Sequence, residues 1–122
     1  MRKFNFLCAA VLALSLTPAL SLAKEPKMTP ELEKKGQAIF TSNGCNACHG
    51  EKGDGSGPAA AALKPPPRNF TKGDFKNGNK PQNLFDSITK GIPKSAMSGY
   101  AHIPENDRWA LVAFIKSLGP KK

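Results

Sequence analysis

Two cysteines and a histidine stand within five consecutive residues, Cys45-Asn46-Ala47-Cys48-His49, and no other feature constrains the fold as strongly. The Cys-x-x-Cys-His order is the attachment motif of c-type haem. Two thiols about one helical turn apart can add to the two vinyl groups on one edge of a porphyrin, and an imidazole directly after them is carried under the iron. The motif therefore predicts one covalently bound haem, with thioether links from Cys45 and Cys48 and with His49 as an axial ligand.

The first 23 residues have the pattern of a secretory signal peptide. Arg2 and Lys3 precede an apolar stretch over residues 7–16, and Ser21-Leu22-Ala23 is a cleavage site of the small-x-small type. The apolar stretch has roughly half of the ~20 residues that a membrane span needs. We therefore expect cleavage near Ala23, export to the periplasm and no stable insertion in the membrane, with an uncleaved signal anchor as the alternative.

The mature chain, residues 24–122, is expected to form one domain that is basic and short of core material. Without Arg2 and Lys3 its formal net charge falls from +9 to +7. Export excludes nucleic acid as the partner of this charge. Large apolar residues are few and scattered, and a small domain of this kind usually needs a staple, a metal or a bound group for stability. The composition thus favours a cofactor.

Other sites built from thiols and an imidazole fit this chain less well. A structural zinc site needs four ligands, and no second cysteine pair exists, because the third cysteine, Cys8, lies within the predicted signal. A thioredoxin-like redox pair needs a βαβ context, for which the sequence holds no pattern. A last alternative is that these residues have no functional role and are two buried cysteines beside a surface histidine. The predicted export of the chain and the long loops around the motif, which suit a bound cofactor, disfavour it.

Start and stop signals predict three helices. Thr29 is placed to cap a helix that begins at Pro30 and ends before Asn43-Gly44. Two further apolar patterns, each beginning near a proline and ending at a glycine, predict helices over residues 81–90 and 104–118. The sequence has no internal repeat and no βαβ unit, so its pattern indicates a helical protein.

The segment after the attachment motif is rich in glycine, proline and asparagine. Residues 50–82 predict a loop, with one helical turn over residues 59–63. A loop this long is unusual in a small domain unless it wraps something other than protein. We therefore predict an all-α fold of three to four helices, with long loops wrapped around one covalently attached haem.

Three side chains of the mature chain are candidates for the second axial ligand: Met28, Met97 and His102. Met28 precedes the first predicted helix, on the wrong side of the attachment motif. Met97 lies in an irregular segment between two predicted helices, where a loop can press a thioether onto the iron, although a lone methionine is commonly core filler. His102 is the rival, and its position is otherwise typical of a solvent-exposed loop histidine. We predict Met97 as the ligand.

Four segments of the chain match a known family in order: Gly36-x-x-x-Phe40, Cys45-x-x-Cys48-His49-Gly50, Gly57-Pro58, and Met97 followed by a helix that bears Trp109. The attachment motif is highly specific, whereas the other segments are specific only in combination. On these segments the chain resembles the small monohaem class I c-type cytochromes of bacteria, over about residues 30–118. The resemblance implies that a face with Gly36 and Phe40 packs against the Trp109 and Val112 side of the last helix.

The resemblance also implies a hydrogen bond that orients the axial histidine. In this family the carbonyl oxygen at the position of Pro58 accepts the Nδ1 hydrogen of the histidine matching His49, which raises the donor strength of the ring. An ordinary turn proline is the alternative for Pro58. Many relatives have proline directly after the ligand methionine, where this chain has Ser98. Without that proline we expect a more mobile loop around Met97.

A histidine and a thioether fill the coordination sphere of the iron. This arrangement suits one-electron transfer, because neither O₂ nor peroxide can bind without displacing a ligand. We therefore expect a periplasmic electron carrier that cycles between Fe(III) and Fe(II), and not an enzyme. The alternatives are a five-coordinate haem protein, acting as a peroxidase or as a sensor of NO or CO, and an electron-transfer subunit of a larger oxidoreductase complex.

Basic residues in the segments expected to surround the haem indicate the kind of partner. They are Lys52, Lys64, Lys72, Lys76, Lys80, Lys90 and Lys94. A basic ring around an exposed porphyrin edge would steer an acidic redox partner into a short-lived complex. Solvated lysines that serve solubility alone are the alternative. We expect a monomer that docks to redox proteins with an acidic surface.

Overall fold

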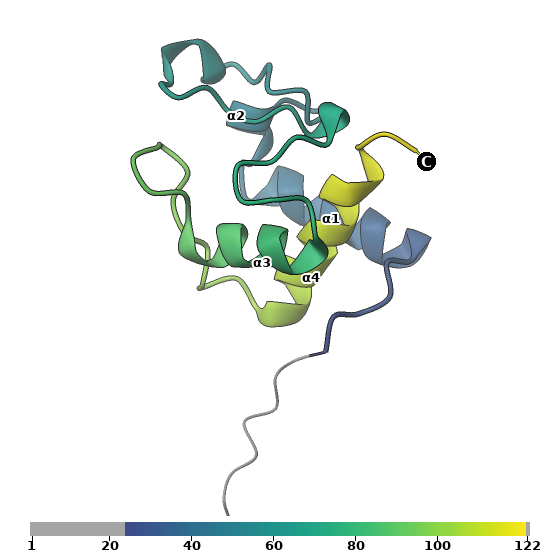
Figure 1. Ribbon diagram of the computed structural model, residues 1–122. Helices are drawn as coiled ribbons and strands as arrows, with labels where there is room; N and C mark the ends of the chain where they lie inside the picture. Colours follow the sequence, from purple (N-terminus) through teal and green to yellow (C-terminus); the bar gives the residue numbers. More distant parts are fainter. Residues whose placement is uncertain (1–23, 122) are drawn as a thin grey trace, which may run out of the picture.

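The computed structural model describes residues 24–121, so the predicted signal peptide, residues 1–23, lies outside the described residues. Over this range the chain is helical and holds no strand, which confirms the all-α prediction. No helix within residues 24–121 is long and apolar enough to cross a membrane. The elements are, in order, α1 (Pro30–Ser42), α2 (Asn46–His49), the 3₁₀-helices η1 (Ala60–Ala62) and η2 (Phe70–Lys72), α3 (Pro81–Lys90) and α4 (Glu105–Ser117) (Figure 1).

The ends of the helices follow the signals in the sequence. The side chain of Thr29 accepts a hydrogen bond from the backbone N–H of Leu32 at 3.2 Å, and Pro30 takes the first helical position of α1. Gly91 ends α3 with a φ of 77°, a value that residues other than glycine rarely adopt. The predicted bounds of α1 and α3 are confirmed, and α4 begins directly after Pro104.

α1 and α4 cross in close contact, and a glycine makes this contact possible. A Cβ at Gly36 would overlap the carbonyl oxygen of Ala110 and come within 2.8 Å of the Cβ of Phe114. Beside the crossing, the rings of Phe40 and Phe114 lie edge to face with their centroids 5.2 Å apart. The expected packing of the Gly36 and Phe40 face of α1 against α4 is therefore present.

The side of α4 that meets Gly36 is not the expected one. The nearest atoms to this glycine belong to Ala110 and Phe114, instead of Trp109 and Val112. Trp109 stacks on Phe85 of α3, with ring centroids 4.3 Å apart. Successive residues of a helix point in different directions. Because Ala110 faces α1, the neighbouring Trp109 points towards α3. An aromatic contact thus joins the middle of α3 to the first turns of α4.

Arg108 adds a polar link between α3 and α4. Its guanidinium lies over the ring of Phe85, 4.8 Å from the centroid. It also donates to the side-chain oxygen of Thr89 and, at 3.0 Å, to the carbonyl oxygen of Ile103. Arg108, which is also bound to the turn before α4, therefore adds to the aromatic contact between α3 and α4.

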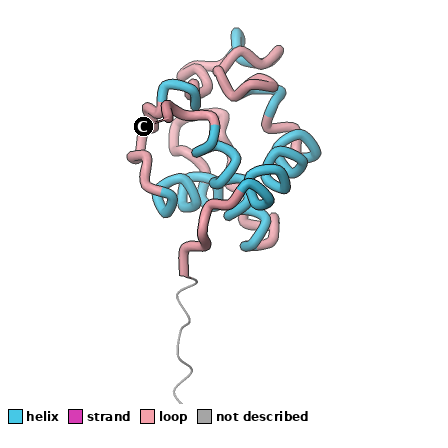
Figure 2. The backbone as a smooth tube through the Cα atoms, turned by 90° about the vertical axis from the view of Figure 1, so that its right-hand side faces the viewer, coloured by secondary structure: helices cyan, strands magenta, loops and turns pink. Residues whose placement is uncertain are grey.

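The long loop and α2 form one side of the molecule, whereas α1, α3 and α4 gather on the other (Figures 1 and 2). The loop folds back on the attachment helix, because the N–H of Gly55 donates to the carbonyl oxygen of His49 at 2.8 Å. Further along, the N–H of Phe70 donates to the carbonyl oxygen of Gly53 at 2.7 Å. The turn expected over residues 59–63 is present as η1, and η2 is a second turn that the sequence pattern did not predict.

Candidate haem site

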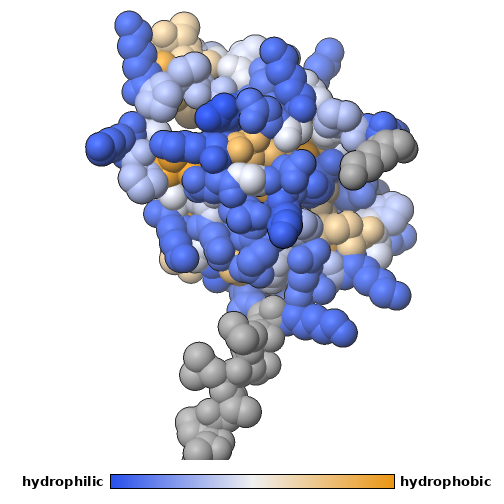
Figure 3. All heavy atoms as spheres, viewed as in Figure 1, coloured by the Kyte–Doolittle hydropathy of each residue, from blue (hydrophilic) through white to orange (hydrophobic). Residues whose placement is uncertain are grey.

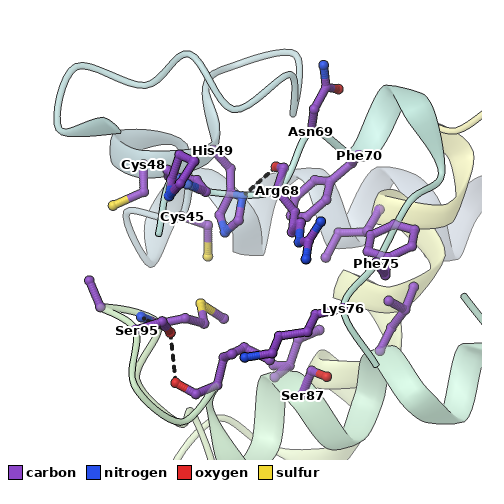
Figure 4. Close-up of a pocket in the computed structure, with 18 of the residues that line it drawn as sticks. Cys45, Cys48, His49, Arg68, Asn69, Phe70, Phe75, Lys76, Ser87 and Ser95 are labelled. Atoms are coloured by element: carbon purple, nitrogen blue, oxygen red, sulfur yellow. Dashed lines mark hydrogen bonds between the residues drawn. The ribbon is translucent and has the colours of Figure 1, made fainter. Parts of the chain in front are cut away.

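A cavity of about 580 Å³ is lined by α2, by the long loop, by the residues after α3 and by side chains of α1, α3 and α4. Cys45, Cys48, His49 and Met97 all contribute to its wall. Figure 4 shows the two thiols and the imidazole on one wall, with Ser95 on the wall across from them. Such a volume with a mainly apolar lining is typical of a site for a large apolar ligand. Its larger apolar lining residues include Phe40, Phe70, Phe75, Ile88, Leu111 and Ile115.

The attachment motif is one turn of helix that begins shortly after α1 ends. Gly44, with a φ of 71°, turns the chain, and the N–H of Cys45 donates to the carbonyl oxygen of Phe40 at 3.0 Å. The N–H of His49 donates to the carbonyl oxygen of Cys45 at 3.0 Å, so a single helical turn carries both thiols to the same cavity. Both thiols are free, and burial raises the pKa of Cys45. The two thiols predicted to bind one porphyrin therefore lie on the wall of one cavity.

The imidazole of His49 is held from two directions. Its Nδ1 lies 3.2 Å from the carbonyl oxygen of Arg68, and because a carbonyl only accepts hydrogen bonds, Nδ1 is the nitrogen that carries hydrogen. The ring stacks on Phe70, with centroids 4.3 Å apart. Burial lowers the pKa of His49, and the hydrogen bond to Arg68 opposes this shift. The neutral ring therefore keeps the lone pair of Nε2 free for a metal ion.

The carbonyl that meets His49 belongs to Arg68, so the prediction that Pro58 provides it is wrong. Near Pro58 the chain runs along the back of α2, where the N–H of Ala59 donates to the carbonyl oxygen of Ala47 at 2.9 Å. Pro58 is exposed and lines a separate, more polar depression beside α2. The loop reaches the imidazole only after its run of three prolines. There the backbone carbonyl of Arg68 makes the contact with Nδ1 that was expected of Pro58.

Of the three candidates for the second axial ligand, only Met97 is among the described residues that line the cavity. His102 is exposed, and its ring lies 5.7 Å from the ring of Tyr100. Met28 packs against the hydrophobic core instead. Tyr100, which no sequence motif singled out, also lines the cavity, and burial raises its pKa. Met97 is thus the thioether that shares a cavity with His49.

Cationic side chains complete the cavity. Arg68, Lys72 and Lys76 are among its lining residues, and their positive charge would suit the carboxylates of a bound porphyrin. The sequence placed Lys72 and Lys76 among the basic residues expected around the haem, whereas no motif marked Arg68. The cavity therefore fits a haem in its thiols, its imidazole, its apolar lining and its cations. Within residues 24–121 no three side chains of His, Cys, Asp or Glu gather as a metal site, so the zinc alternative has no ligand set there.

Comparison with known proteins gives one family and several relatives. Residues 33–119 match the family model described as cytochrome c. The chain is similar to lupanine 17-hydroxylase [cytochrome c] from a Pseudomonas species, with 33% identity over 104 residues. It is also similar to a chain of the reducing HAO-like protein complex of Kuenenia stuttgartiensis, with a TM-score of 0.75 and 28% identity. Cytochrome cL of the marine methylotroph Methylophaga aminisulfidivorans shares the fold, with a TM-score of 0.55 and 19% identity.

These relatives are longer than the chain. The match to lupanine 17-hydroxylase covers 85% of this chain and 14% of that protein. The match to the Kuenenia structure covers 84% of this chain and 50% of that one, and the match to cytochrome cL covers 72% and 53%. The chain thus spans about half the length of the solved structures, and a much smaller part of the hydroxylase.

Proposed function

This chain belongs to the cytochrome c family and carries one covalently bound haem c, and from this premise we propose that it is a periplasmic one-electron carrier. His49 and Met97 are the axial ligands in this proposal, and Cys45 and Cys48 form the thioether links. The haem supplies the change between Fe(III) and Fe(II). The protein supplies ligands, orientation and a cavity that keeps water away.

The observation that carries the proposal is the gathering of Cys45, Cys48, His49 and Met97 in one cavity, although Met97 lies far along the chain. The carbonyl oxygen of Arg68 fixes the ring of His49 with Nε2 available for the iron. A histidine and a thioether together fill the coordination sphere. Such a full sphere favours electron transfer over the binding of a substrate at the iron.

The lysines predicted to surround the haem support a partner with an acidic surface. All of them, from Lys52 to Lys94, are exposed, and Lys72 and Lys76 also line the cavity. Hydrophilic residues cover most of the face in Figure 3, with apolar residues visible between them. The positive charge would raise the rate of encounter with an acidic redox protein and leave the complex short-lived. In this proposal the carrier is a monomer between encounters.

A second candidate function is an electron-transfer subunit of a larger oxidoreductase. Two findings favour it: the similarity to a small part of lupanine 17-hydroxylase and the similarity to a chain of a HAO-like protein complex. Both functions use the same haem ligands and differ in whether the partner is permanent. The mass of the protein isolated from its native compartment at physiological salt separates them, because a carrier runs as the mature chain alone.

The ligands are tested by the absorption spectrum of the purified ferric holoprotein in the red region, where a thioether–iron bond gives a weak charge-transfer band. The proposal predicts this band, its loss in Met97→Ala and its retention in Met28→Ala. Met28 is a matched control because it packs against the core and not in the cavity. A high-spin spectrum without the band would overturn the proposal and favour the five-coordinate peroxidase or sensor. A low-spin spectrum without the band, altered by His102→Ala, would assign the ligand to His102.

A further inference from the structure

The segment that carries Met97 forms a closed turn after α3. The N–H of Ile92 donates to the carbonyl oxygen of Met97 at 3.0 Å, which joins the two ends of the turn. Beyond the turn, the N–H of Tyr100 donates to the carbonyl oxygen of Ile88 in α3 at 2.8 Å. One backbone hydrogen bond therefore closes the turn at Met97, and the other ties the chain after the turn to the end of α3.

The hydroxyl of Ser95 bridges the interior of this turn. It donates to the carbonyl oxygen of Ile92 at 2.7 Å and accepts a hydrogen bond from the N–H of Met97 at 3.1 Å. Both hydrogen bonds are partly buried, and Ser95 lines the cavity on the wall across from His49 (Figure 4). One side chain thus connects the start of the turn to the residue that is proposed as the iron ligand.

The turn also contains a strained residue. Lys94 has a φ of 58°, and among the described residues it is the one amino acid other than glycine with a positive φ. Side chains make this conformation sterically costly, and it persists where the surrounding structure holds it. Lys94 directly precedes Ser95, so the two hydrogen bonds of the serine hydroxyl oppose relaxation of the turn. Their loss would leave the backbone of Met97 held in the turn only by the hydrogen bond from the N–H of Ile92 to its carbonyl oxygen.

We propose that Ser95 is the positioning residue for the axial thioether, because its hydroxyl fixes the backbone of Met97 and so keeps the sulfur on the iron. This inference rests on the proposed function, in which Met97 is a ligand. It also changes the expectation for Ser98, whose presence in place of proline pointed to a mobile loop. The restraint comes from the residue two positions before the methionine. Ser98 itself is exposed, and within residues 24–121 its side chain makes no hydrogen bond.

The test measures how readily an external ligand displaces the thioether. Imidazole added to the ferric holoprotein takes the coordination position that the sulfur of Met97 leaves, so its apparent affinity reports the population in which that bond is open. Ser95→Thr and Ser95→Val form a matched pair, because the two side chains have the same shape and only threonine keeps the hydroxyl. We expect Ser95→Val and Ser95→Ala to bind imidazole about three- to tenfold more tightly than the wild type. Ser95→Thr should stay within about twofold of it.

Two controls separate positioning from general stability. Ser98→Ala removes a hydroxyl from the same segment and should leave imidazole affinity unchanged. Gly36→Ala strains the crossing of α1 and α4, away from the turn, and should lower the denaturant midpoint without tightening imidazole binding. Equal affinities in Ser95→Thr and Ser95→Val would overturn the proposal. So would an increase in Gly36→Ala as large as that in Ser95→Val.

The wild-type spectrum distinguishes failure of this inference from failure of the proposed function. If the red band is absent from the wild type, Met97 is not a ligand, the proposed function fails, and Ser95 has no thioether to position. The other outcome is a band that is present in the wild type and lost in Met97→Ala, together with equal imidazole affinities in Ser95→Thr and Ser95→Val. The proposed function then stands, and only the role of Ser95 is overturned.

Discussion

The imidazole of His49 stacks on the ring of Phe70, with centroids 4.3 Å apart and planes inclined by 24°. Phe70 is only 6% exposed. It also stacks on Phe75, with centroids 5.7 Å apart, and meets Phe40 edge to face at 6.4 Å. The histidine that carries the iron in our proposal is therefore joined to the core through an aromatic ring as well as through its own backbone.

Replacing Phe70 by leucine keeps most of the apolar volume and removes the aromatic stack on His49. We expect Phe70→Leu to lower the free energy of unfolding by about 1 kcal/mol, and Phe70→Ala to lower it by about 3–5 kcal/mol. Denaturant unfolding of the ferric holoprotein measures both changes. The ring resonances of His49 in the reduced protein should shift in Phe70→Leu and stay in place in Phe75→Leu, which leaves the His49 stack intact. Equal shifts in the two variants would contradict the role of this stack.

A methyl group at position 36 has no space at the crossing of α1 and α4. We expect Gly36→Ala to lower the free energy of unfolding by about 1–3 kcal/mol, because the two helices must separate to admit the Cβ. Thermal unfolding of the holoprotein measures the loss. The control is Gln37→Ala, an exposed position on the same helix, which should change stability by less than about 0.5 kcal/mol. A melting temperature of Gly36→Ala equal to that of the wild type would show that the crossing adapts.

The chain should not fold cooperatively without its haem. In the double variant Cys45→Ala/Cys48→Ala the covalent links are lost, and the apolar wall around Phe70 and Ile88 would face a water-filled cavity of about 580 Å³. Small domains have little core with which to offset such an exposure. Far-ultraviolet circular dichroism of the haem-free variant should show little helix and no sharp thermal transition. Native helix content with a cooperative transition would argue that the cavity is stable when empty.

Electrostatic steering is tested by the rate of electron transfer with an acidic redox protein as a function of ionic strength. Lys64→Gln and Lys72→Gln each remove an exposed charge close to the cavity, and we expect each to slow association about two- to threefold at low ionic strength. Lys34→Gln, on the exposed face of α1, should have a smaller effect. Rates that do not depend on salt, or that fall equally in all three variants, would leave the lysines a role in solubility alone.

The helices were predictable because residues at or next to their ends specify where they begin and end. Thr29 and Pro30 specify the start of α1, and a glycine with a positive φ ends α3 at Gly91. The attachment motif was equally predictable. Cys45, Cys48 and His49 are neighbours in sequence, so the motif can be identified without knowledge of the fold. Local sequence therefore specified one wall of the cavity and most of the helical framework.

Other parts of the site depend on the path of the loops, which no periodic pattern encodes. The acceptor for Nδ1 of His49 is a backbone carbonyl, and any residue at position 68 supplies one, so its side chain gives no signal. The sequence did not predict that Trp109 contacts α3. Ala110 instead of Trp109 lies at the crossing with α1, and the exact residue at a helix crossing is not encoded by the apolar pattern. The role of Ser95 depends on a turn whose geometry appears only when residues 92–97 are placed in space.

The crossing at Gly36 and Ala110 joins the first and last helices of the described chain, and we expect it to give the molecule two levels of unfolding. Bringing such distant segments together has the largest entropic cost of loop closure in the fold. While α1 and α4 remain in contact, the segments between them can open locally without repeating that cost. The turn that carries Met97 belongs to these intervening segments. We therefore expect it to leave the cavity in a local opening while α1 and α4 stay docked, so that exchange of the ligand proposed at Met97 would not require global unfolding.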